Sequence, residues 1–236
     1  MSSLRDIHLA LRLERAVNAL CPYVARRHER RTSTPRSEAA MRRELVGCIL
    51  GSQVRNEMAI RFTRRLVGAG LLQTKWWSRQ KSPSFERRLV AELGNSGNTS
   101  NCSKYRFPRS RSRQLAVIRD TLAQRSLQSR VDAHSDPREL RRRLVCLFPG
   151  VGPKQASMFL RNVGATLELA VLDVHVLRFL AIQGLLPDRT TFCATLRSYE
   201  RVESIFADYS RQLGFQPGLV DVAVWATMKA AERVIQ

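Results

Sequence analysis

The chain has 236 residues, of which 44% are hydrophobic and 25% are charged, so it can bury a substantial core in one domain or in two closely packed lobes. Its formal net charge of +20 and its pI near 11.3 favour a polyanionic partner. Charged residues interrupt the apolar residues near the N-terminus, which excludes a secretion signal or a membrane span there and predicts a cytoplasmic protein that acts on the nucleoid.

Apolar residues at helical spacing predict an all-α chain. The sequence contains no alternating strand pattern and no internal repeat, and the polar residues 94–103 are typical of a surface loop. The adjacent Trp76 and Trp77 cannot share one helix face, so we expect a buried loop anchor, with a wedge into DNA as the alternative role for one of them. Helices are expected, in chain order, over residues 5–31 (bent near Pro22), 37–50, 55–71, 84–93, 110–128, 137–147, 153–163, 174–183, 190–213 (with a break) and 217–235.

Cysteine and histidine are too dispersed for a metal site or a disulfide framework. The cysteines form an odd set at wide spacings, which is typical of reduced thiols: Cys21, Cys48, Cys102, Cys146 and Cys193. There is no C-terminal cluster of cysteines that could hold an iron–sulfur cluster. The four histidines suggest no zinc site, and we expect His175 to be packed or hydrogen-bonded near Asp173.

Residues 136–164 predict a helix, a glycine hairpin and a second helix. Asp136 and Glu139 form a capping box around Pro137, which stands at the first helical position. The next helix opens at Pro153, and the residues between the two helices are too few and too rich in glycine for anything but a tight turn.

The turn itself is a candidate site for a DNA phosphate. Backbone N–H groups in a turn before a helix lack intrahelical partners, so they can hold a phosphate without reading the base sequence. The residues expected to contact the DNA backbone are Gly150, Val151 and Gly152.

Lys154 lies in the first turn of the predicted second helix, where a cation is disfavoured by the helix dipole. The chain has five lysines against thirty-five arginines, so a lysine is uncommon here. A helix N-terminus favours the neutral amine, which is the nucleophilic form. A lysine that only binds phosphate is the alternative, and Lys154 alone leaves both interpretations open.

Asp173 follows Lys154 by nineteen residues and opens the next predicted helix as its N-cap. Capping alone would explain an aspartate at this position. An ionised carboxylate there is also suited to stabilise the positive charge of an oxocarbenium-like sugar. The two roles are compatible.

Residues 148–164 together with 172–175 resemble the helix-hairpin-helix DNA glycosylases, and among these they are most similar to the compact archaeal and bacterial 8-oxoguanine DNA glycosylase/lyases. Weaker likeness follows in the same chain order at residues 44–53, 105–113 and 220–225. The resemblance implies a single glycosylase domain of two helical lobes over residues 1–236. Its parts would be a helical-barrel lobe at about 37–135, the helix-hairpin-helix at 136–164, and a second lobe formed by 1–36 and 165–236.

The resemblance also implies the chemistry. Lys154 would form a Schiff base with the sugar of a flipped 8-oxoguanine nucleotide, Asp173 would be its acidic partner, and β-elimination would nick the strand. Met158 and Trp225 would line the base pocket. The implied partner is damaged double-stranded DNA, bound by a monomer without a metal, an organic cofactor or a membrane.

Two departures from the family pattern concern the ends and loops of the chain. Archaeal members tend to end in a basic tail that helps to read the base, whereas this chain ends at residues 228–236 without one, and the insert at 94–103 is additional. Two alternatives remain open. One is a non-catalytic helix-hairpin-helix module that binds DNA, and the other is a glycosylase for oxidised pyrimidines, which the missing cysteine cluster disfavours.

Overall fold

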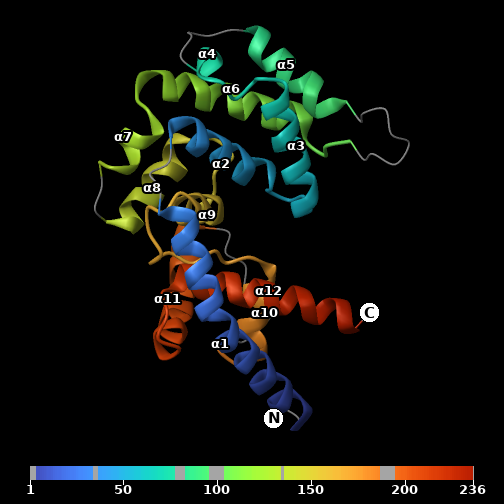
Figure 1. The fold of residues 1–236 in the computed structure, drawn as a ribbon, viewed down its shortest axis with the longest axis vertical. Helices are drawn as coiled ribbons and strands as arrows, with labels where there is room; N and C mark the ends of the chain where they lie inside the picture. The colour runs from blue at the N-terminus through green and yellow to red at the C-terminus, as the bar shows by residue number, and fades with distance from the viewer. Residues whose placement is uncertain are drawn as a thin grey trace. The chain divides into compact units, whose positions relative to one another are not determined.

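The computed structural model describes residues 4–33, 37–77, 83–95, 104–133, 136–186 and 195–235. Over these residues the chain forms twelve α-helices and no strand (Figure 1), which confirms the predicted all-α fold. The chain divides into two compact units. We call Met1–Pro35 with Gly164–Gln236 the terminal unit and Arg36–Val163 the central unit.

The terminal unit is built around its last helix. Helices α1, α10 and α11 each pack against α12, and their apolar faces form one core that includes Val17, Phe179, Phe206 and Val220, all with no exposed surface. These three contacts with α12 explain why amphipathic helices from both ends of the chain are stable here. The helices are α1 (Leu4–Thr32), α10 (Val174–Ile182), α11 (Leu196–Gln212) and α12 (Pro217–Ile235).

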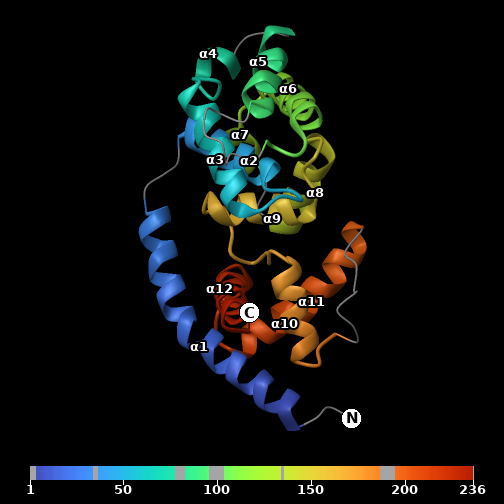
Figure 2. The same ribbon diagram turned by 90° about the vertical axis from the view of Figure 1, so that its right-hand side faces the viewer.

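The central unit is built around α2, which packs against α3, α6, α7 and α9. Helix α5 lies along α6, and α8 lies against α9, as both views of the ribbon show (Figure 2). The helices are α2 (Glu38–Leu50), α3 (Asn56–Gly68), α4 (Thr74–Trp77), α5 (Pro83–Gly94), α6 (Pro108–Gln124), α7 (Leu127–Val131), α8 (Pro137–Leu147) and α9 (Pro153–Asn162).

The single helix expected over residues 110–128 is wrong, because the chain breaks at Arg125. There the backbone is extended, with φ −153° and ψ 129°, and a new helix, α7, begins at Leu127. The Ser126 side chain accepts the N–H of Ser129 at 3.1 Å and so caps α7. The carboxylate of Glu38 on α2 accepts two further amides of the same turn, at 2.9 and 3.0 Å.

Buried arginines stabilise the central unit. Arg42 is 3% exposed, burial lowers its pKa, and its guanidinium lies 5.8 Å from the ring centre of Trp77. Arg119 is 2% exposed and lies 4.7 Å from the ring centre of Phe85. These cations therefore pack on aromatic rings inside the unit, where such contacts are strongest.

The tryptophan pair lies on the short helix α4 and not in the expected loop, and one member is buried as expected. Trp77 is 3% exposed and donates its indole N–H to the carbonyl of Leu71 at 3.0 Å. Trp76 is half-buried beside Phe85 and lies under the guanidinium of Arg88, 5.0 Å from its ring centre. Trp77 therefore anchors the chain between α3 and α4.

The cysteines within the described ranges form no disulfide bond: Cys21, Cys48 and Cys146. Burial raises the pKa of Cys21 to about 11. Cys102, Cys193, residues 187–194 and most of the loop expected at 94–103 lie outside the described residues. Where the structure is described, it holds no group of three or more metal-binding side chains, and no helix there is long and apolar enough to cross a membrane.

Candidate active site

The predicted helix-hairpin-helix is present in the central unit. Asp136 caps α8 by accepting the N–H of Arg138 at 2.9 Å. The capping box expected with Glu139 is wrong, because the Glu139 carboxylate instead accepts Nε of Arg143 at 2.9 Å. Phe148 ends the helix with no exposed surface and anchors the turn in the core. Gly150 has φ +82°, a left-handed conformation that glycine adopts without steric cost, and its backbone lies so close to Gln114 that a Cβ would collide with that side chain.

Two of the three turn amides expected to bind phosphate already have acceptors within the hairpin. The N–H of Val151 donates to the carbonyl of Phe148 at 3.1 Å. The N–H of Gly152 donates to Oε1 of Gln155 at 3.2 Å, because Gln155 reaches back over the first turn of α9. A phosphate that contacts the Gly152 amide must therefore displace the Gln155 oxygen or share the Gly152 N–H with it.

Lys154 lies in the first turn of α9, and its side chain is half-buried. The helix beneath it is held at two points. The fully buried Arg141 on α8 donates to the hydroxyl of Ser157 at 3.2 Å, and Asn162 donates to the carboxylate of Glu44 on α2 at 2.6 Å. These two bonds fix the position of α9, the helix that carries Lys154.

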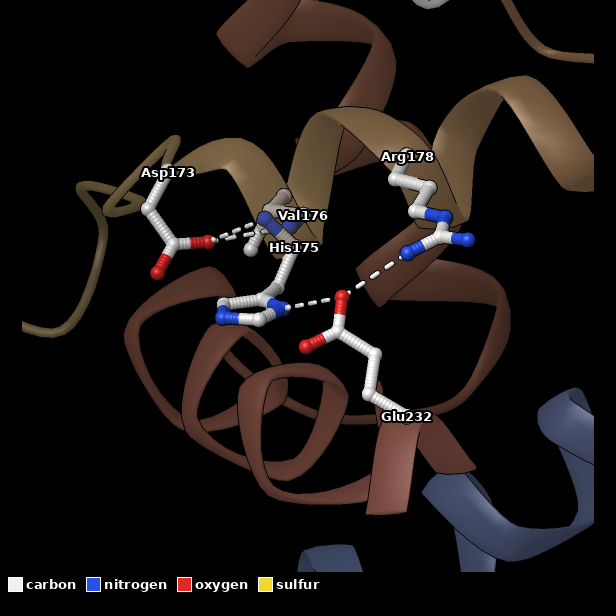
Figure 3. A network of polar contacts seen from close by, with 5 residues as sticks. All are labelled: Asp173, His175, Val176, Arg178 and Glu232. Atoms are coloured by element: carbon white, nitrogen blue, oxygen red, sulfur yellow. Dashed lines mark hydrogen bonds and ion pairs between the residues drawn. The ribbon is translucent and has the colours of Figure 1, made fainter. Parts of the chain in front are cut away.

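Asp173 lies in the terminal unit and caps α10 (Figure 3). Its Oδ1 accepts the amides of His175 and Val176 at 2.9 and 3.0 Å. Its Oδ2 points away from both amides in Figure 3, and the described part of the chain offers it no hydrogen-bond partner. The side chain is half-buried, so one oxygen stabilises the helix and the other is open to a ligand.

His175 packs beside this cap and faces the last helix. Its side chain is 18% exposed, and Nδ1 lies 3.7 Å from Oε1 of Glu232, beyond hydrogen-bond distance. The same glutamate oxygen accepts Nη1 of Arg178 at 2.8 Å (Figure 3). The histidine is therefore packed next to a charge pair between α10 and α12.

The two residues expected to line a base pocket belong to different units. Met158 is half-buried one helical turn after Lys154 in the central unit. Trp225 is half-buried on α12 in the terminal unit, and the ammonium of Lys229 lies 4.9 Å from its ring centre. Each unit thus contains one candidate catalytic residue and one candidate pocket residue.

The central unit also contains an open hollow that is separate from the hairpin. It has a volume of about 290 Å³, and neither Lys154 nor the hairpin glycines line it. Its lining residues are Glu38, Arg42, Thr74, Trp77 and 122–126.

The chain matches the protein family described as 8-oxoguanine DNA glycosylase over residues 25–215. It is 29% identical over 202 residues to an 8-oxoguanine DNA glycosylase/AP lyase of Korarchaeum cryptofilum, and the match covers 86% of each chain. It is 30% identical over 190 residues to a protein of the same description from Thermoplasma volcanium, with 80% of each chain covered.

Solved structures show the same likeness. The 8-oxoguanine DNA glycosylase of Thermotoga maritima superposes with a TM-score of 0.71 at 28% identity, covering 93% of this chain and 95% of its own. That of Methanocaldococcus jannaschii superposes with a TM-score of 0.72 at 24% identity, covering 94% of each chain, and supports the fold.

Proposed function

The chain belongs to the 8-oxoguanine DNA glycosylase family, and from this membership we propose that it is a bifunctional DNA glycosylase and AP lyase. It removes 8-oxoguanine from damaged double-stranded DNA and then nicks the strand at the abasic site. It acts as a monomer, and the reaction uses neither a metal ion nor an organic cofactor. The match over residues 25–215 carries the proposal, because this range contains both Lys154 and Asp173.

Lys154 is the proposed nucleophile. Its neutral amine attacks C1′ of the flipped nucleotide, and the bond from C1′ to the base breaks as the base leaves with the electron pair. Opening of the sugar ring then gives a Schiff base between the amine and C1′. Loss of a proton from C2′ expels the 3′ phosphate by β-elimination, and water releases the lysine.

Asp173 is the proposed acidic partner. Its open Oδ2 stabilises the positive charge that develops on the sugar and accepts the proton that Lys154 loses. Its other oxygen keeps the carboxylate in place through the two amides of α10. The amides of Gly150, Val151 and Gly152 hold the DNA backbone, and at Gly152 the phosphate displaces the Gln155 oxygen or shares the N–H with it.

Met158 and Trp225 are the proposed walls of the base pocket, because a sulfur-containing and an aromatic side chain both stack on a flat base. Discrimination from guanine rests on the extra N7 hydrogen of 8-oxoguanine. A buried acceptor that pairs with one base and is left unpaired by the other separates the two far better than shape does.

Borohydride trapping tests the nucleophile. The wild-type protein should form a stable crosslink to a duplex that carries 8-oxoguanine opposite cytosine, and Lys154→Gln should form none while still binding the duplex. Lys75→Gln is the matched control, since Lys75 is an exposed lysine on α4 of the same unit. Equal trapping by Lys154→Gln would reject Lys154 as the nucleophile, and no trapping on any damaged duplex would favour a non-catalytic DNA-binding module.

The substrate is tested by ranking damaged bases under single-turnover conditions. We expect excision of 8-oxoguanine opposite cytosine at least about tenfold faster than excision of thymine glycol, a difference of about 1.4 kcal/mol in activation free energy. The reverse order would reject the oxidised-purine assignment in favour of a glycosylase for oxidised pyrimidines.

A further inference from the structure

The residues directly before Asp173 form a buried segment without regular secondary structure. Leu169, Ala170, Val171 and Leu172 are 1%, 0%, 6% and 4% exposed, and none belongs to a helix. Their backbone N–H groups cannot reach water, so each requires an acceptor inside the protein. The identity of these acceptors determines what holds the segment in place.

Three consecutive amides of this segment donate to side chains of two other helices. All three acceptor side chains are themselves buried, with 2%, 1% and 2% exposed surface for Tyr199, Glu203 and Asp221. The tyrosine hydroxyl makes a second bond, in which it donates to the carbonyl of Ala170 at 2.8 Å. The donor and acceptor pairs are Ala170 N with Glu203 Oε1 at 3.1 Å, Val171 N with Asp221 Oδ2 at 2.6 Å, and Leu172 N with the Tyr199 hydroxyl at 3.0 Å.

Tyr199 and Glu203 are one turn apart on α11 and therefore lie on the same helix face. The start of α12 adds a fourth restraint. The N–H of Gly218 donates to the carbonyl of Leu167 at 2.8 Å, and a Cβ at Gly218 would lie only 3.2 Å from the carbonyl oxygen of Leu169. Helices α11 and α12 thus hold the segment through side chains and through close backbone packing.

The position of Asp173 depends directly on this segment. The N–H of Asp173 donates to the carbonyl of Val171 at 3.0 Å, and Val171 is held by Asp221. We propose that Tyr199, Glu203 and Asp221 are positioning residues for the Asp173 carboxylate, and this proposal rests on the proposed function. We call the three residues the amide clasp.

The clasp matters for rate because catalysis by an oriented charge is sensitive to small displacements. A shift of about 1 Å in a reacting group can lower a rate by about a hundredfold. In the described structure, the three amides are held by acceptor side chains on α11 and α12. Removing one acceptor therefore loosens the backbone next to Asp173 and leaves the Asp173 side chain unchanged.

Tyr199→Phe is the first test, because it removes the hydroxyl and keeps the ring. Tyr209→Phe is the matched control. Tyr209 is a buried tyrosine on the same helix, its hydroxyl is buried without a hydrogen-bond partner in the described structure, and it does not bond the segment. We expect the single-turnover rate of 8-oxoguanine release at saturating enzyme to fall at least about tenfold in Tyr199→Phe and to stay within twofold in Tyr209→Phe. The enzyme concentration at half-saturation should stay within twofold in both, because the hairpin is unchanged.

A double-mutant cycle with Asp173→Asn separates positioning from a loss of folded protein. If Tyr199 acts through Asp173, then Tyr199→Phe should lower the rate no further in the Asp173→Asn background. All rates are measured well below the unfolding temperature of each variant. An equal rate loss in both backgrounds would overturn the proposal, and so would a wild-type rate for Tyr199→Phe.

Glu203 provides a second route if Tyr199→Phe does not fold. Glu203→Gln keeps an acceptor for the Ala170 amide, whereas Glu203→Met keeps the approximate size and removes the acceptor. We expect Glu203→Gln to retain a rate within threefold of the wild type and Glu203→Met to lose at least about tenfold. An equal loss in the two variants would overturn the acceptor role.

The outcomes distinguish this inference from the proposed function. If the wild-type protein releases no 8-oxoguanine and forms no borohydride adduct, the proposed function fails. If the wild type is active and the clasp variants match it, the function stands and the clasp proposal fails.

Discussion

The proposed function gives Asp173 two purposes through different oxygens, helix capping and charge stabilisation, and substitution can separate them. Asparagine keeps an oxygen that caps α10, so Asp173→Asn should unfold within about 2 °C of the wild type, whereas its single-turnover rate should fall by about 10²-fold or more. Asp173→Ala loses the cap as well and should lower the free energy of unfolding by about 0.5–2 kcal/mol. Calorimetry and rapid-quench kinetics measure the two effects. A normal rate in Asp173→Asn would reduce the residue to a helix cap.

Gly150 is required for its backbone conformation. Alanine at φ +82° is strained, so Gly150→Ala should lower the free energy of unfolding by about 1–2 kcal/mol even if Gln114 moves aside. Gly68→Ala is the control, because Gly68 lies at the end of α3 with nothing within 4 Å of its Cβ position. It should match or exceed the wild-type stability in urea denaturation. A loss in Gly68→Ala as large as in Gly150→Ala would contradict the explanation.

Local signals predict the candidate catalytic residues, and non-local contacts explain what those signals miss. In the sequence, Pro153 and the capping residue Asp173 mark two helix starts. The structure places Lys154 and Asp173 at these starts. The bond from the Gly152 N–H to Gln155 could have been predicted, because Gln155 is the third residue of its helix and a glutamine there closes a capping box. The contact of Tyr199 with the segment before Asp173 spans 27 residues and has no local signature.

At the scale of elements, the sequence predicts most helix ends to within a residue or two. The hairpin helices end as expected because Asp136, Pro137 and Pro153 act on their own neighbours. The break between α6 and α7 has one local signal, the N-cap Ser126, but the Glu38 carboxylate that satisfies two amides of α7 comes from a position 89 residues earlier in the chain. Local helix propensity continues across Arg125, and the tertiary contact overrides it.

Glu38 is therefore expected to hold α7 in place. Glu38→Ala leaves the amides of Leu127 and Gln128 without their carboxylate and should lower the free energy of unfolding by about 1–3 kcal/mol. Glu38→Gln keeps one acceptor and should lose about half as much. Urea denaturation measures both. Equal stability of the alanine variant and the wild type would show that Ser126 alone suffices as the cap.

At the scale of the whole molecule, the charge of +20 predicts steep salt dependence of DNA binding. Neutralising about six to ten phosphates releases their counterions, so affinity for an undamaged duplex should fall by about 10³-fold or more between 50 and 200 mM salt. Fluorescence anisotropy with a labelled duplex measures this slope. A change of less than about tenfold would mean that few of the arginines contact the DNA; Arg42 and Arg119 are buried in the central unit.

The proposed double use of the Asp173 carboxylate has an evolutionary consequence. One nucleotide change converts an aspartate codon into an asparagine codon, and asparagine still caps a helix. Proteases in the cell remove unfolded chains, so a variant that stays folded but has lost its catalytic activity is not removed. A descendant gene with this change would encode a protein that remains abundant and occupies DNA without repairing it, and only selection on the mutation rate of the organism would act against it.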